Sequence, residues 1–216
     1  MSQQPAGERT DPPEVIYLIR HGEKPGDQHE KHEKHGKNGK HATSSFVATD
    51  FQGNHDPHGL VPLGWQRSGA LTALFNPHHG PLRSGLRVPA ALLSPSYGDP
   101  AKTAARRAYL TIQGLAERLG QAIATPFEVG HESKLAASLL SGDADVVLIC
   151  WEHHRLPAIA AALPVEPGTV IPDEWPDDRY DVIWAFTRLP GAPVSYAFSE
   201  LPQRLLPGDQ DTGICG

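Results

Sequence analysis

The chain has few cysteines, no long apolar run and no excess of positive charge. It holds 2 cysteines in 216 residues, Cys150 and Cys215, too few for a disulfide framework. No stretch approaches the roughly 20 apolar residues that a membrane helix needs, and the N-terminal MSQQPAGERTDPPE lacks the apolar run of a signal peptide. The formal net charge of −6 disfavours a nucleic-acid partner, which usually binds a basic surface. These absences predict a cytoplasmic protein without a nucleic-acid or membrane partner.

Apolar patterning divides the chain into alternating strands and helices. Runs of β-branched and aromatic residues predict strands, and apolar residues that recur every three to four positions predict helices. The predicted strands are 14–20, 89–96, 122–127, 145–151, 180–186 and 194–198, and the predicted helices are 63–75, 101–119, 132–141 and 156–163. This alternation predicts an α/β fold with a mainly parallel sheet covered on both faces, a three-layer α/β/α sandwich. The last two strands are expected to pair as an antiparallel hairpin.

The length of the chain suits one domain. Residues 1–13 are expected to be a disordered leader, and 14–216 to form a single domain with a long loop at 24–59. Six histidines and five lysines lie in that loop. Its His-rich tract, 29–41, has no cysteine and contains two glycines, which favours a solvated loop over a metal site, with metal storage as the alternative. The acidic PDEWPDDR at 172–179 is likewise expected to be a solvated turn.

Histidine-bearing segments follow two of the most apolar predicted strands. Arg20 and His21 end the first, and Glu152, His153 and His154 follow the strand at 145–151. Because ligands bind outside the carboxyl ends of strands in open α/β sheets, parallel neighbours would bring both segments to one crevice. Glu23 and Lys24, which come next after the first segment, are expected to form an exposed ion pair.

Several segments carry a resemblance to a known family. IRHGE (19–23) resembles the signature of the histidine phosphatase superfamily, which includes the cofactor-dependent phosphoglycerate mutases. Three further segments, 60–71, 92–120 and 146–163, resemble the family's other motifs in matching order, and Trp-Glu-His resembles the second motif of a bacterial subgroup. The resemblance implies the phosphoglycerate mutase-like fold.

The resemblance also implies roles for the residues of the first and third motifs. His21 matches the nucleophile that forms a phosphohistidine, and Arg20 matches the first phosphate-binding arginine. Arg107 matches the second because Thr111 follows it by four residues, with Arg106 as the competitor. Two nearby guanidinium groups would lower the pKa of His21 by charge repulsion and keep its imidazole neutral. A neutral nucleophile suits attack on a dianionic phosphomonoester.

The second histidine and the proton donor complete the implied site. His153 matches the second catalytic and phosphate-binding histidine, with His154 as the competitor. Glu128 fits the acidic proton donor by order, and Glu132 and Glu152 are alternatives. The expected function is hydrolysis of a small phosphorylated substrate without metal or organic cofactor. A mutase-like phosphotransferase and a phospholigand-binding domain without turnover are the other hypotheses.

Overall fold

The structure is a computed structural model that describes residues 11–26, 47–99 and 103–215. The His-rich tract at 29–41 and the first ten residues of the predicted leader therefore lie outside the described residues. Pro13, the last residue of that leader, is buried, and its carbonyl accepts a hydrogen bond of 2.8 Å from the Tyr196 hydroxyl. Within the described ranges, no helix has the length and apolar character needed to cross a membrane.

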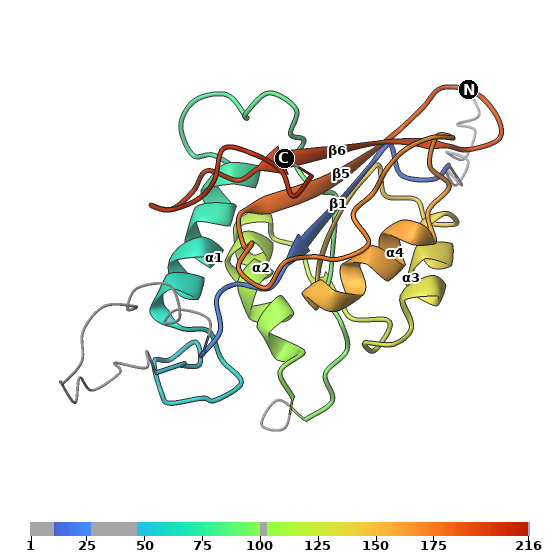
Figure 1. Ribbon diagram of the computed structural model, residues 1–216. Helices are drawn as coiled ribbons and strands as arrows, with labels where there is room; N and C mark the ends of the chain where they lie inside the picture. Colours follow the sequence, from blue (N-terminus) through green and yellow to red (C-terminus); the bar gives the residue numbers. More distant parts are fainter. Residues whose placement is uncertain (1–10, 27–46, 100–102, 216) are drawn as a thin grey trace, which may run out of the picture.

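The described residues form an α/β fold with strands and helices near the predicted positions (Figure 1). The strands are β1 (Val15–Arg20), β2 (Ala91–Leu93), β3 (Ile123–Ala124), β4 (Val146–Trp151), β5 (Val182–Arg188) and β6 (Tyr196–Pro202). The helices are α1 (Pro62–Phe75), α2 (Arg106–Leu119), α3 (Glu132–Leu139) and α4 (Leu156–Ala161), and a 3₁₀ turn at His153–Arg155 precedes α4. Helix α2 begins five residues later than predicted and ends, as predicted, at Leu119; the capping residue Gly120 follows with a φ of 65°. That left-handed conformation is the one in which glycine has no steric penalty.

The strand order is β3-β2-β4-β1-β5-β6. Strands β3, β2, β4 and β1 pair in parallel, whereas β5 is antiparallel to both β1 and β6. The sheet is therefore mixed: β3, β2, β4 and β1 form its parallel part, and β5 and β6 are added to it by antiparallel pairing. The short β5–β6 connection can join only antiparallel strands. The predicted hairpin is confirmed.

Two apolar clusters pack on opposite faces of the sheet. One joins α1 and α2 to residues such as Tyr17 and Leu148, and the other joins α3 and α4 to residues such as Leu18 and Ile149. Figure 1 shows the two helix pairs on either side of the strands. Strands β1 and β4 are buried at every position because both of their faces are covered, which explains their continuous apolar sequence.

Candidate active site

The carboxyl ends of β1 and β4 place two histidines side by side. Arg20 is in register with Trp151, and the His21 N–H donates to the Trp151 carbonyl at 3.2 Å, which extends the pairing by one residue. The His21 and His153 rings are both buried, 5.6 Å apart between centroids and nearly perpendicular at 83°. His154, by contrast, exposes 63% of its side chain. The predicted meeting of the two strand ends is confirmed, and His153 is the histidine that faces His21.

The environment of His21 favours a neutral imidazole with a defined tautomer. Its Nδ1 lies 2.8 Å from the Gly22 carbonyl, which can only accept, so Nδ1 carries the proton and the lone pair is on Nε2. Burial holds the pKa of His21 well below its usual value, and the positive charge of Arg20 lowers it further. The His21 imidazole is therefore neutral at neutral pH, with an unprotonated Nε2 that can act as a base or a nucleophile.

Thr111 joins the turn after β1 to the first turn of α2. Its hydroxyl accepts from the Gly22 N–H at 2.7 Å and donates to the Arg107 carbonyl at 2.7 Å. Helix α1 also approaches this turn closely: a Cβ added to Gly64 would lie 2.6 Å from the Glu23 carbonyl oxygen. The spacing of Arg107 and Thr111 thus has a structural cause, since one hydroxyl bridges the two backbone segments that carry His21 and Arg107.

A cavity of about 330 Å³ opens beside His21. His21, Lys24, Arg107 and Glu152 supply its polar lining, and small side chains at 103–108 form much of the rest. Carbonyls of Gly59 (3.1 Å) and Pro57 (2.8 Å) hold the Arg107 guanidinium in place. The neighbouring arginine, Arg106, pairs instead with Asp56 at 2.8 Å and does not line this cavity. Of the two candidate arginines, Arg107 is the one placed with His21.

Arg20 lies beneath the segment that precedes β5. Its NH1 group donates to the carbonyls of Pro176 at 3.1 Å and Asp177 at 2.7 Å, and its guanidinium carbon lies 3.6 Å from the centre of the Tyr180 ring. The Arg20 side chain is buried and does not line the His21 cavity. Arg20 therefore supplies a buried positive charge next to His21 and at the same time binds the 176–180 segment.

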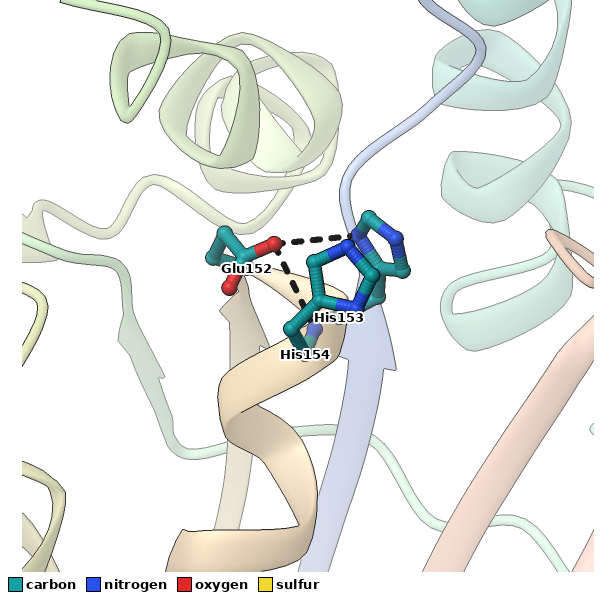
Figure 2. A group of neighbouring side chains, drawn as sticks. All are labelled: Glu152, His153 and His154. Atoms are coloured by element: carbon teal, nitrogen blue, oxygen red, sulfur yellow. Dashed lines mark hydrogen bonds and ion pairs between the residues drawn. The ribbon is translucent and has the colours of Figure 1, made fainter. Parts of the chain in front are cut away.

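Carboxylates face both ring nitrogens of His153. Its Nε2 lies 2.7 Å from Asp177 Oδ1, and its Nδ1 lies 3.2 Å from Glu152 Oε1, close enough for charge pairing though not aligned as a hydrogen bond. Figure 2 shows Glu152 turned toward His153 and also accepting from the His154 backbone N–H. Burial alone would raise the pKa of Glu152, but its contacts with His153 and His154 outweigh burial and lower that pKa. The His153 ring thus lies between two carboxylates, one at each ring nitrogen.

The same side chains offer the nearest approach to a metal site among the described residues. Ligand atoms of Glu152, His153 and His154 all lie within 4.8 Å of one another. Two ligands of a tetrahedral zinc ion, each about 2.0–2.1 Å from the metal, lie roughly 3.3 Å apart. Asp177 is not one of these three residues. Its Oδ1 lies 2.7 Å from His153 Nε2, too close for a zinc ion to bind both atoms, so this contact is a direct hydrogen bond.

The three candidate acids occupy different positions. Glu152 lines the His21 cavity. Glu128 is exposed and lines a second cavity of about 310 Å³, which shares Thr103, Ala105 and Val129 with the first. Glu132 is buried and accepts hydrogen bonds from the Gly130 N–H at 2.8 Å and the Trp151 indole at 3.1 Å. Glu132 is thus committed to holding α3 against β4.

The expected exposed ion pair between Glu23 and Lys24 is wrong. Glu23 does not form an exposed pair with Lys24, because it is buried and bound to the Arg67 guanidinium at 2.8 Å. Arg67 is also buried and binds Asp209 at 2.8 Å. A buried carboxylate needs a cationic partner, and α1 supplies it from 44 residues away.

The segment 172–179 is not a solvated turn throughout. Trp175 is buried, and its indole donates to the Arg179 carbonyl at 2.7 Å. Arg179 is buried as well and pairs with Asp181 at 2.8 Å. These anchors place Asp177 against His153, a contact that sequence reasoning missed. A tryptophan and an arginine flanking an acidic pair were the available signal.

Comparison with known proteins leaves the family of the chain open. No protein-family model matches the sequence, and no curated protein is significantly similar to it. The resemblance to the histidine phosphatase superfamily stays a prediction.

Proposed function

We propose that this protein is a phosphomonoester hydrolase that acts through a phosphohistidine on His21. The observation that carries the proposal is the pairing of a neutral, buried His21 with His153 at the edge of a cavity lined by Arg107. The Nδ1 contact with Gly22 aims the lone pair away from the backbone, on Nε2. The proposal includes a phosphoglycerate mutase-like sandwich, a cytoplasmic location and a small phosphorylated substrate.

In the proposed reaction, His21 Nε2 attacks phosphorus as the bond from phosphorus to the ester oxygen breaks. The leaving alkoxide takes a proton from a carboxylic acid, and water then attacks phosphorus and breaks the bond to Nε2. The proton released by that water returns to the carboxylate, so the enzyme is regenerated. Arg107 and His153 bind phosphoryl oxygens, and the buried charge of Arg20 stabilises the negative charge that is redistributed in the transition state.

Glu128 is the proposed proton donor. Glu132 is engaged by two donors of the protein, and the lowered pKa of Glu152 favours its ionised form, which suits a partner of His153 better than an acid. Glu128 is exposed in the cavity that adjoins the His21 cavity. A leaving group directed along the shared wall at Thr103, Ala105 and Val129 would approach this carboxyl.

Hydrolysis of 4-nitrophenyl phosphate by wild type and three variants tests the proposal. His21→Ala should lower kcat by at least about 1,000-fold, as expected when a covalent nucleophile is removed. His153→Ala should lower kcat strongly, whereas His154→Ala, at the exposed neighbour, should stay within about twofold of wild type. Addition of an alcohol acceptor separates transfer to water from transfer to a hydroxyl. Unchanged activity in His21→Ala, or no activity in wild type, would contradict the proposal.

A further inference from the structure

The 176–180 segment contacts two residues of the proposed phosphate site, Arg20 and His153. Backbone carbonyls of this segment accept from Arg20, the Tyr180 ring lies against the Arg20 guanidinium, and the Asp177 carboxylate accepts from His153 Nε2 at 2.7 Å. A carboxylate oxygen and a phosphoryl oxygen are both anionic acceptors with similar hydrogen-bond lengths. Asp177 thus makes the contact with His153 that a phosphoryl oxygen would make.

The flanks of the segment are fixed, whereas the Asp177 side chain is not. Buried Trp175 and Arg179 hold the two sides, the latter through Asp181 and through the carbonyls of Thr212 (2.6 Å) and Gly213 (2.8 Å). The Asp177 side chain is 72% exposed, and its Oδ1 lies 2.7 Å from His153 Nε2 and 3.6 Å from His154 Nε2. Rotation about its side-chain bonds can therefore release His153 without moving the backbone that covers Arg20.

We infer that Asp177 is an intramolecular competitor of phosphate, whose carboxylate occupies the oxygen-binding position at His153 until a phosphoryl group displaces it. This inference rests on the proposed function and adds regulation of the same site. Displacement is an equilibrium between an occupied and an open form. If Asp177 occupies the position about 90% of the time, it weakens apparent phosphate affinity by about tenfold.

Titration calorimetry with inorganic phosphate tests this inference in the full-length protein. Measurements compare wild type, Asp177→Asn, Asp177→Ala and the control Glu174→Gln, which changes an exposed carboxylate two residues before the 176–180 segment. At about 0.15 M ionic strength the Debye length is about 8 Å, which limits the effect of a distant charge. Both Asp177 variants should bind phosphate roughly tenfold more tightly than wild type, and Glu174→Gln should bind within about twofold of it.

Three results would overturn the inference, and they differ in what else they overturn. Phosphate binding by wild type that is unchanged or weakened in both Asp177 variants would reject the competitor but leave the phosphatase proposal intact. Absence of phosphate binding in every protein would reject both. Equal tightening in Glu174→Gln would show that the effect comes from net charge alone, which also rejects a specific role of Asp177.

Discussion

Replacing Thr111 by valine removes the hydroxyl that joins the turn after β1 to helix α2. Both backbone partners of this hydroxyl would lose a hydrogen bond, and the Gly22 N–H, now 2.7 Å from the oxygen, would be buried without an acceptor. An unsatisfied buried donor costs about 1–3 kcal/mol. Valine has nearly the same shape as threonine, so no cavity adds to this cost. The free energy of unfolding should fall by about 2 kcal/mol.

Thr111→Ser is the matched control because it keeps the hydroxyl and loses only a methyl group. Burial of one methyl group contributes about 1 kcal/mol. For a chain of this length, 1 kcal/mol shifts the melting temperature by about 2–4 °C. Calorimetry should therefore show Tm lowered by about 4–8 °C in Thr111→Val and by about 2–4 °C in Thr111→Ser.

The hydroxyl also positions the two groups of the proposed site, so activity should follow the hydroxyl rather than the methyl. With 4-nitrophenyl phosphate, kcat should fall about tenfold or more in Thr111→Val and stay close to wild type in Thr111→Ser. Equal loss of stability in both variants, or a valine variant as stable as wild type, would refute the bridging role.

Three further predictions follow from backbone packing, from the state of His21 and from the proposed acid. Gly64→Ala should lower Tm, because the added Cβ would lie 2.6 and 2.9 Å from backbone atoms of Glu23. Gly69→Ala in the same helix has open space around the added Cβ and should raise Tm. The opposite order of the two Tm values would contradict the packing argument. The pKa of His21 is lower in the folded protein than in the unfolded chain, so its contribution to stability is present above about pH 6.5 and is lost as the pH falls below that value. Below that pH, the free energy of unfolding measured in urea should depend on pH more steeply in wild type than in His21→Asn, by up to about 1.4 kcal/mol per pH unit. Parallel curves for the two proteins would refute this prediction. Glu128→Gln should lower kcat for glycerol phosphate by about 100-fold, but should hardly change kcat for 4-nitrophenyl phosphate, because the nitrophenolate leaving group needs little protonation. Equal losses with both substrates would exclude Glu128 as the proton donor.

The apolar pattern of the sequence was sufficient to predict the central strands and the residues that meet at their carboxyl ends. The continuous apolar runs around Leu18 and Ile149 predict strands covered on both faces, and such strands pair at the centre of the sheet. Because these strands are parallel neighbours, the position of His21 next to His153 followed from where each apolar run ends. The choice of His153 over His154 followed equally from its place as the first histidine after the strand.

Contacts between distant segments could not be predicted in the same way. The partner of Glu23 is Arg67, and the partner of His153 is Asp177, on segments separated by 44 and 24 residues. No local periodicity encodes which polar residue of another element will face a given side chain. The buried face of α1 carries Arg67 instead of an apolar residue, so the helix lacks the pattern that would have indicated burial there.

The positions of the two cysteines allow the opening rate of the sheet to be measured from the alkylation of the native protein. Cys150 is fully buried near the carboxyl end of β4, whereas Cys215 is exposed. Burial also raises the pKa of the Cys150 thiol, so an alkylating reagent meets a reactive thiolate there only after the strand separates from its neighbours. The exposed Cys215 would react without any opening of the sheet and would calibrate the reagent. The slower modification, followed by mass spectrometry, would then give the opening rate of the central strands without any introduced probe.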